Sequence, residues 1–274
     1  MKKTYYIENT EENYNYVLEK LINQEKLTQF LIKETNYTKS VITNHFNYIF
    51  NDNGKNDMEL LKLINKVKSD SNKYAKNNNI EPIKSDAIKW YYFDDFVFKN
   101  TKEHTFSGFQ MDLNSAYWSL AVKRGIITNK TFAYWDETTK GKTDKERKSI
   151  RLKALGSLAT VKRITMYEKG AYKELEPEYN KANRNLYLDI CDSVSNLMLD
   201  IQKKVGCSYF YWDMFILQNI KQVDAINELL QTYGIKAKVI KDNFKIVKSE
   251  NHNFIYSEKK NYSYPIKQEE IIYN

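Results

Sequence analysis

In the first third of the chain, apolar residues recur mostly at the spacing of an α-helix. A first helix is expected to begin near Asn9, because Asn9 and Glu12 fit an N-cap and its reciprocal acid. Three further helices are predicted over residues 27–33, 38–50 and 57–75. The polar run at residues 51–56 is the best candidate for a linker. Residues 1–85 are therefore predicted to form a mostly helical N-terminal region.

The pattern changes after Pro82, where short aromatic and β-branched runs alternate with helical ones. Strands are expected over residues 90–98, 105–111, 209–217, 235–240 and 244–247, with a hairpin over 160–175. Helices are expected over residues 115–124, 143–158, 178–205 and 221–233. When residues 126–176 are set aside, this order is that of a split βαβ antiparallel sheet with helices on one face. The predicted fold class is α+β, with a domain over residues 86–274 interrupted by an insertion at about 126–176.

Residues 29–49 are similar to helix-turn-helix modules. Asn36 would occupy the turn position, where asparagine tolerates the left-handed conformation. The resemblance implies that four residues of the second helix point towards a DNA groove, namely Lys39, Ser40, Thr43 and Asn44. A plain bundle of helices with a polar face fits the same pattern.

Composition and charge narrow the class of partner. The 274 residues carry a net charge of +8, which favours a polyanion, with nucleic acid as the first candidate. A basic surface without a specific partner, or coding from AT-rich DNA, would give the same excess. The chain has no apolar run approaching the ~20 residues that span a bilayer, and its start lacks the apolar core of a signal peptide. A cytoplasmic protein with no membrane partner is therefore expected.

Two carboxylates stand out because the predicted sheet brings them together. Asp112 ends one expected strand and Asp213 lies in the middle of an aromatic strand pair. Neighbouring carboxylates without histidine suit Mg²⁺ or Mn²⁺. Two such ions about 3.5–4 Å apart are the common device for nucleotidyl transfer. Aspartates at strand ends also serve as helix caps and turn residues, so this pairing alone is compatible with a purely structural role.

Three segments resemble the polymerase motifs of family B DNA polymerases. Residues 111–118, Met-Asp-Leu-Asn-Ser-Ala-Tyr-Trp, resemble motif A, in which Ser and Tyr follow the Asp by three and five residues. Residues 147–158 resemble motif B, a basic helix that leads into a Ser-Leu pair. Residues 209–215, Tyr-Phe-Tyr-Trp-Asp-Met-Phe, resemble motif C, an aromatic strand with a carboxylate at a hairpin. The motifs occur in the family order, and the resemblance covers residues from about 105 to 245.

The resemblance implies a palm domain with a fingers-like insertion and assigns a role to each motif residue. Asp112 and Asp213 would bind the metals. Ser115 and nearby backbone amides would bind the triphosphate, and Tyr117 would stack under the incoming sugar. A basic helix face would hold phosphates through Arg147, Lys148 and Arg151, any of which Lys153 could replace. Alternatively, Tyr117 is an aromatic residue of the core, and the basic helix is a solvent-exposed surface that binds no phosphate. The implied partners are DNA, as primer-template or single strand, and dNTP.

The chain also departs from the family pattern. In motif C, Phe215 takes the place of the second aspartate. In motif B, Gly156 stands where the family usually has Asn, and in motif A, Trp118 replaces the Pro that usually follows the tyrosine. Asp94 or Asp95, in a Tyr-x-Asp-Asp match that precedes motif A, could supply a third carboxylate. We expect no proofreading exonuclease domain, because 274 residues leave no room for one.

Three interpretations remain. The first is a minimal, divergent DNA polymerase that adds deoxynucleotides to a primer 3′-OH. A phage origin would fit such a protein and would place it in the host cytoplasm. The second is a degenerate palm that acts as a DNA-binding replication or regulatory accessory protein. The third is a basic structural or interaction protein with accidental motif matches.

Overall fold

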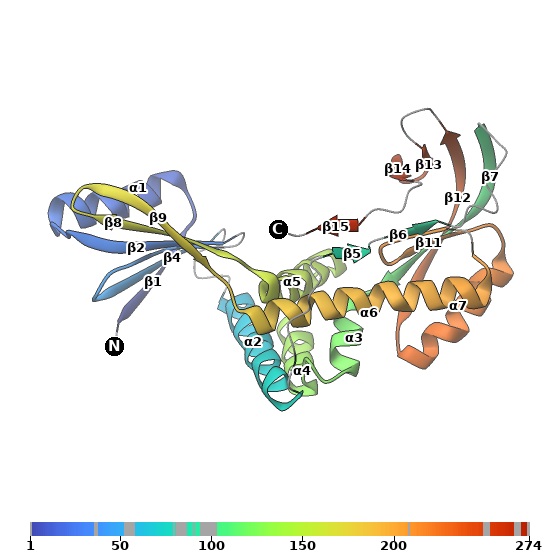
Figure 1. Ribbon diagram of the computed structural model, residues 1–274, viewed down its shortest axis with the longest axis horizontal. Coiled ribbons are helices and arrows are strands. Elements are labelled where there is room, and N and C mark those ends of the chain that lie inside the picture. The colour runs from blue at the N-terminus through green and yellow to red at the C-terminus, as the bar shows by residue number, and fades with distance from the viewer. Residues whose placement is uncertain are drawn as a thin grey trace. The chain divides into compact units, whose positions relative to one another are not determined.

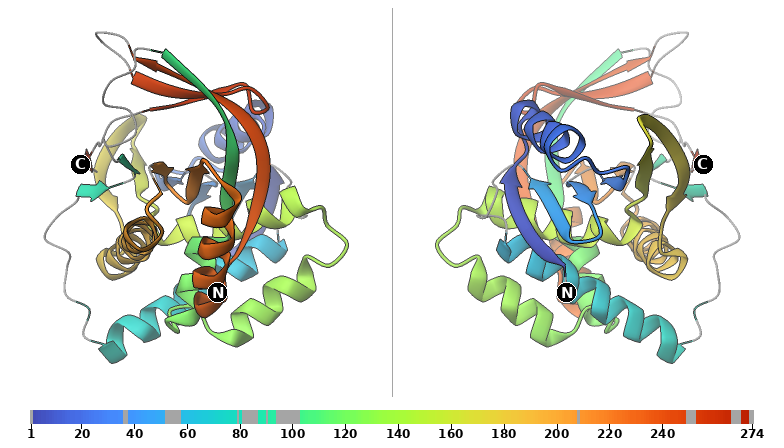
Figure 2. Two further views of the ribbon diagram at one scale, coloured as in Figure 1. Left: turned by 90° about the vertical axis from the view of Figure 1, so that its right-hand side faces the viewer. Right: turned by 90° about the vertical axis from the view of Figure 1, so that its left-hand side faces the viewer.

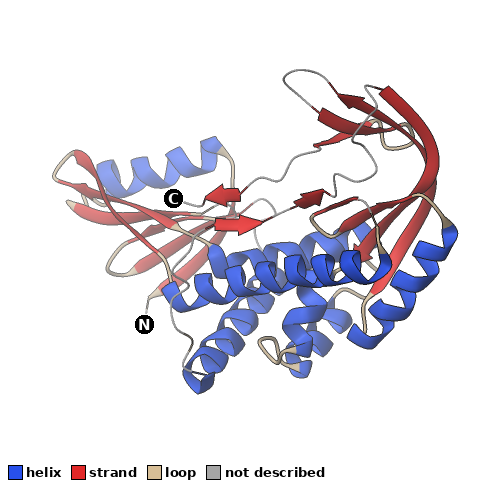
Figure 3. Cartoon of the chain, turned by 45° about the vertical axis from the view of Figure 1, so that its right-hand side comes forward, coloured by secondary structure: helices blue, strands red, loops and turns tan. Residues whose placement is uncertain are grey.

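The chain folds into two compact units, each assembled from two stretches of sequence. The computed structural model describes residues 2–35, 38–51, 58–78, 80, 87–89, 91–93, 103–207, 209–248, 253–265 and 270–272. Unit 1 comprises Met1–Pro82 and Ile127–Tyr187, and unit 2 comprises Ile83–Ile126 and Leu188–Asn274. Both contain helices and sheets (Figures 1 and 3), so the predicted α+β class is confirmed.

Unit 1 contains a mixed sheet in the order β1-β4-β3-β2-β8-β9. Its strands are β1 (Lys3–Glu8), β2 (Gln29–Glu34), β3 (Lys39–Ile42), β4 (Phe46–Asn51), β8 (Lys162–Glu168) and β9 (Ala171–Glu178). The pair β1–β4 is parallel and the other pairs are antiparallel. Helix α1 (Glu11–Glu19) continues into the π-helical turn η1 (Lys20–Gln24). Val17 and Leu21 of this helical segment pack against buried residues of the sheet.

The helix-turn-helix expected over residues 29–49 is wrong, because this stretch forms β2, β3 and β4. Phe30 and Ile32 are buried while Gln29, Leu31 and Lys33 are more exposed, an alternation with the period of a strand. Val41 on β3 and Tyr48 on β4 belong to the same core. The N-terminal region is therefore not mostly helical, since its core is a sheet covered by one helical segment.

The prediction of a helix after the polar run at 51–56 is confirmed. Helix α2 (Met58–Asn78) shares unit 1 with α4 (Asn129–Thr138), α5 (Asp144–Gly156) and the short 3₁₀ helix η3 (Ser157–Ala159). A capping box starts α5, in which Thr143 and Glu146 bond each other's backbone amides.

The segment expected as an insertion folds together with the N-terminal region. The hairpin predicted around Lys169-Gly170 is present as β8 and β9, and β8 pairs with β2. Phe30 on β2 stacks on Tyr167 of β8, with ring centroids 4.6 Å apart. Such a pairing joins residues more than a hundred positions apart, which explains why local patterns did not reveal it.

Unit 2 is built around an antiparallel sheet in the order β14-β13-β12-β7-β11-β10-β6. Its strands are β6 (Tyr91–Phe93), β7 (Glu103–Asn114), β10 (Tyr209–Tyr211), β11 (Met214–Leu217), β12 (Lys236–Lys248), β13 (Asn253–Ser257) and β14 (Tyr262–Pro265). A separate pair joins β5 (Ala87–Lys89) to β15 (Glu270–Ile272). Figure 2 shows β7 and β12 as a long, curved pair. The four strands β12-β7-β11-β10 have the order of a split βαβ sheet.

The two faces of this sheet differ. Helix α3 (Ala116–Lys123), the part of α6 (Lys181–Val205) beyond residue 187, and α7 (Ile220–Tyr233) contribute to one apolar core with the sheet. Met111 and Phe215 point into that core. A second apolar cluster includes Met214 and Tyr264. Side chains alternate between the two faces along β7, so Asp112 and Met111 lie on opposite faces. Asp112 is paired with Met214 on β11, and the two side chains share one face of the sheet.

Several predicted boundaries are confirmed by the structure. Helices α3, α6 and α7 are each followed by a glycine in the left-handed conformation, namely Gly125, Gly206 and Gly234. In contrast, the two strands expected around residues 241–243 are one continuous strand, β12. Asp242 is buried there and is satisfied by Ser257 and by the amides of Asn243 and Lys259, so a polar residue does not end the strand.

Within the parts of the chain that the structure describes, no helix has both the length and the apolar composition needed to cross a bilayer.

Candidate functional site

Asp112 and Asp213 occupy adjacent positions in the sheet of unit 2. Asp112 lies near the end of β7 and is paired with Met214, the first residue of β11. Asp213 directly precedes Met214, in the turn between β10 and β11, and its carbonyl accepts a hydrogen bond of 2.8 Å from the amide of Leu113. Neighbouring strands lie about 4.8 Å apart. The backbones of the two aspartates are therefore next to each other, as expected from the split βαβ order.

The carboxylate of Asp112 is held by groups on its own face of the sheet. The side-chain amide of Gln110 donates to both carboxylate oxygens, at 3.2 and 3.0 Å. The ammonium of Lys260 lies 3.6 Å from Oδ2. The hydroxyl of Tyr264 donates a hydrogen bond of 3.3 Å to Oε1 of Gln110. Burial, followed by the charge of Asp112, raises the pKa of Tyr264 to about 12.

The groups that face the Asp112 carboxylate, the Gln110 amide nitrogen and the Lys260 ammonium, are hydrogen-bond donors and cannot bind a metal. A divalent cation here would have the carboxylate and water as ligands. The Asp112 side chain is 35% exposed, so its oxygens remain partly accessible, and the Lys260 ammonium already places one positive charge beside them. Mg²⁺ commonly binds through one or two carboxylates together with water and substrate phosphates. Among the described residues, no group of three or more His, Cys, Asp or Glu side chains is placed to hold a metal. Asp94 and Asp95 lie outside the described residues.

Phe215, the residue expected in place of a second motif C aspartate, is fully buried. Its side chain lies in the core beneath the sheet and contacts the ring of Phe210, with centroids 5.9 Å apart. This position could not hold a carboxylate without burying a charge among apolar side chains.

The two turns next to the aspartates both contain a non-glycine residue in the left-handed conformation. Ser115, directly before α3, has φ 59° and ψ 37°, and its side chain does not cap the helix. Trp212, directly before Asp213, has φ 59°. Such conformations cost about 1–2 kcal/mol for a non-glycine residue and tend to occur at functional sites. Tyr117, in the first turn of α3, is partly buried and packs against the core of unit 2.

The residues expected to hold phosphates belong to unit 1, on α5, and two of them make intramolecular contacts. Arg147 pairs with Asp136 at 2.5 Å and donates to the carbonyl of Thr139. The guanidinium groups of Arg147 and Arg151 lie 4.7 and 4.6 Å from the ring centre of Trp135. Burial, and then the neighbouring Arg147, lower the pKa of Arg151. Lys148 is exposed, whereas Lys153 is partly buried like the two arginines, so Lys148 is the most accessible cation of the predicted set.

We expect Arg147→Ala to destabilise unit 1 by about 1–2 kcal/mol, because it removes a cation–π contact and an ion pair together. The measurement is the urea unfolding midpoint, followed by tryptophan fluorescence. Lys148→Ala, on the same helix but exposed, is the matched control and should change stability by no more than about 0.5 kcal/mol. Equal effects of the two substitutions would contradict a structural role for Arg147.

The four residues expected to contact DNA from a recognition helix lie on β3 and in the turn that follows it. Lys39 lies over the ring of Tyr14, 3.6 Å from its centre, and Ser40 donates to the carbonyl of Lys33. Thr43 is buried and accepts from the amides of the turn, whereas Asn44 is exposed. These residues therefore form no helical surface that could enter a groove.

The structure thus divides the predicted site residues between the two units. Asp112, Asp213, Ser115 and Tyr117 belong to unit 2, and the basic residues of α5 belong to unit 1. Sequence reasoning missed Gln110, Lys260 and Tyr264. The only local signal for them is that Gln110 precedes Asp112 by two residues, which places both on one face of a strand.

Comparison with known proteins assigns neither a family nor a function to the chain. No protein-family model matches the chain, and neither a curated protein nor a solved structure is significantly similar to it.

Proposed function

We propose that unit 2 is a polymerase-type palm and that the protein is a DNA polymerase-like nucleotidyltransferase. The observation that carries this proposal is the adjacency of Asp112 and Asp213 at the end of β7 and in the β10–β11 turn. Both belong to segments that resemble family B motifs, and the strand order around them is that of a split βαβ sheet. The net charge of +8 is consistent with a nucleic-acid partner.

In this proposal the two aspartates hold Mg²⁺ or Mn²⁺, and the other residues position the nucleotide. The bound metal would lower the pKa of the attacking 3′-hydroxyl and stabilise the leaving oxygen. Ser115 and the amides at the start of α3 offer hydrogen-bond donors and a helix N-terminus to the triphosphate. Tyr117, in the first turn of the same helix, contacts the sugar. Gln110 holds the Asp112 carboxylate in place through two hydrogen bonds.

The direct test is extension of a labelled DNA primer by the purified full chain. Wild-type protein with dNTPs and Mg²⁺ or Mn²⁺ should lengthen the primer on a primed template and should not do so with EDTA. Mn²⁺ is expected to support more extension than Mg²⁺, because it binds a carboxylate-poor site more tightly. Absence of extension with both metals on several templates would contradict catalysis.

A second candidate is a palm without catalysis that binds DNA as a replication or regulatory accessory protein. Phe215 favours it, because the buried ring leaves motif C with one carboxylate. The contact of Lys260 with Asp112 favours it as well, since an ammonium near the carboxylate reduces the need for a metal. This candidate predicts salt-dependent binding to primed or single-stranded DNA together with no extension under any metal condition.

A further inference from the structure

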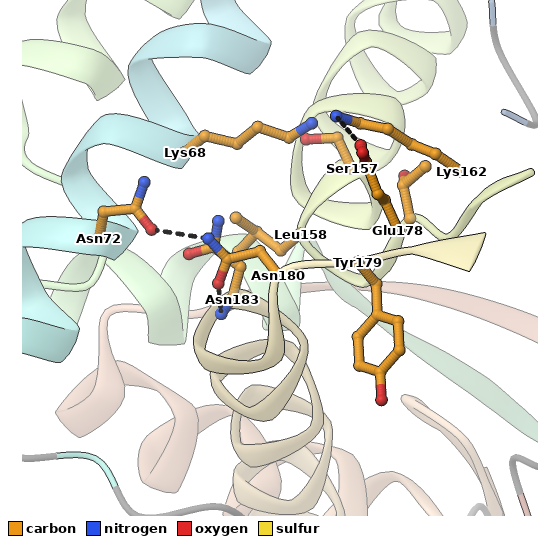
Figure 4. Close-up of a pocket in the computed structure, with 10 residues that line it drawn as sticks. Lys68, Asn72, Ser157, Leu158, Lys162, Glu178, Tyr179, Asn180 and Asn183 are labelled. Atoms are coloured by element: carbon orange, nitrogen blue, oxygen red, sulfur yellow. Dashed lines mark hydrogen bonds and ion pairs between the residues drawn. The ribbon is translucent and has the colours of Figure 1, made fainter. Parts of the chain in front are cut away.

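Unit 1 contains a cavity of about 390 Å³ whose lining includes two lysines and three asparagines. Figure 4 shows its walls, which come from four elements: α2, η3, the β8–β9 hairpin and the start of α6. The residues that the argument uses are Lys68, Asn72, Lys162, Glu178, Asn180 and Asn183. None of them belongs to the motifs considered above.

Two lysines approach each other across the mouth of this cavity. Lys68 extends from α2 and Lys162 from β8, and their ammonium groups point to the same region in Figure 4. Lys68 is partly buried. Burial, and then the charge of Lys162, lower the pKa of Lys68. The two ammonium groups repel each other, so an anion bound between them would be stabilised by both.

Within the described residues, no carboxylate forms an ion pair with Lys68. The one acid in the lining is Glu178, and its Oε2 already lies 2.9 Å from Lys33. Lys162 lies 4.0 Å from the same oxygen. Glu178 is thus shared between two lysines and is not available to neutralise Lys68. Partly buried ammonium groups normally have a partner, because leaving one unpaired costs free energy.

Asparagine side chains line another part of the cavity. Asn180 donates to Oδ1 of Asn72 at 3.3 Å and accepts from the amide of Asn183 at 3.0 Å. Asn183 is buried, and its Oδ1 has no hydrogen-bond partner among the described residues. Buried polar atoms without a partner are rare in folded proteins. A ligand with both an anionic group and hydrogen-bond donors would satisfy the lysines and this oxygen together.

A second cavity of about 360 Å³ adjoins the first and shares Asn72 and Asn180 with it. Lys76, also on α2, lines this second cavity. Basic groups therefore follow α2 past the point where Asn72 and Asn180 meet. This arrangement suits a ligand with more than one phosphate.

We propose that the cavity binds a phosphate group, with Lys68 and Lys162 as its cationic ligands and with Asn183 Oδ1 as the acceptor for a hydrogen-bond donor elsewhere on the same ligand. The phosphate belongs to a nucleotide or to the backbone of single-stranded DNA, which share this chemistry. The proposal does not depend on polymerase activity, because all of its residues lie in unit 1 and its test measures binding.

The experiment uses the full chain and two probes, dATP by calorimetry and a fluorescein-labelled twelve-nucleotide dT strand by anisotropy. Lys68→Met should weaken binding of the probe at least about tenfold, the loss expected from one charge-assisted hydrogen bond. Lys68→Arg should retain most of the affinity. Lys73→Met is the matched control, because Lys73 is an exposed lysine of α2 outside both cavities. It removes the same charge and should change the affinity less than twofold.

The two probes identify the source of the phosphate. Loss confined to dATP assigns a nucleotide site, and loss confined to the dT strand assigns a backbone site. Thermal melting of the free protein provides a second measurement, since Lys68→Met removes an unpaired charge and should leave the melting temperature equal or higher. The proposal is overturned if neither probe binds at millimolar concentration, or if Lys68→Met and Lys73→Met weaken binding equally.

Discussion

Asp112→Asn is expected to reduce primer extension at least about a hundredfold, which corresponds to about 2.7 kcal/mol of transition-state stabilisation. An amide is neutral and offers one oxygen, whereas the proposed metal site needs anionic oxygens. The substitution keeps the size of the side chain, and the remaining oxygen can still accept from Gln110. Folding should therefore be preserved, which circular dichroism can check. The measurement is the rate of primer extension with Mg²⁺ and with Mn²⁺.

Asp224→Asn is the matched control for this prediction. Asp224 lies on α7 in the same unit and is exposed, so its substitution removes one negative charge without touching the proposed site. It should leave the extension rate within about twofold of wild type, as expected of an exposed position without special contacts. If Asp112→Asn extended primers as fast as Asp224→Asn did, the activity would have to come from a contaminant or from another site.

Asp213→Asn should be about as damaging as Asp112→Asn. Family B polymerases carry a second motif C aspartate, but here Phe215 lies in the core at that position. No neighbouring carboxylate of the β10–β11 hairpin can take over the role of Asp213. A mild effect of Asp213→Asn with a severe effect of Asp112→Asn would indicate that the second carboxylate of the metal site comes from elsewhere in the chain.

The parts of the fold that sequence predicted best are those fixed by neighbouring residues. Helices α6 and α7 end at glycines that adopt positive φ, and the β8–β9 hairpin turns at Lys169-Gly170. These signals act over a few residues and do not depend on tertiary packing. Residues 29–49 were predicted wrongly because their apolar residues fit helical spacing as well as strand alternation. The pairing of β2 with β8, more than a hundred residues away, decides in favour of strands.

The same distinction applies to the candidate site. The adjacency of Asp112 and Asp213 could be predicted, because it follows from the strand order once the elements are correct. The contacts of Lys260 and Tyr264 around Asp112 could not, since these residues lie about 150 positions further along the chain. Arg147 and Arg151 show a similar limit, because the basic pattern of α5 gives no sign of the contact with Trp135.

Gly108→Ala is expected to destabilise unit 2 by about 3 kcal/mol, at the upper end of the usual cost of overpacking. A Cβ at this position of β7 would lie 2.4 Å from the carbonyl oxygen of Leu217 on β11. Backbone atoms cannot move aside as a flexible side chain can, so β7 and β11 would have to separate. The measurement is the urea unfolding midpoint of the variant compared with that of wild type.

Gly125→Ala separates this clash from the general cost of replacing a glycine. Gly125 follows α3 with φ +75°, and a Cβ there would meet nothing within 4 Å, so only backbone strain of about 1 kcal/mol is expected. Gly108→Ala should therefore be clearly the more damaging of the two. Because β7 and β11 also position Asp112 and the turn with Asp213, their separation should lower primer extension even at temperatures where the variant remains folded. Equal stability of the two variants would mean that the strands around Gly108 can adjust, and that the spacing of β7 and β11 is not fixed by close backbone contact.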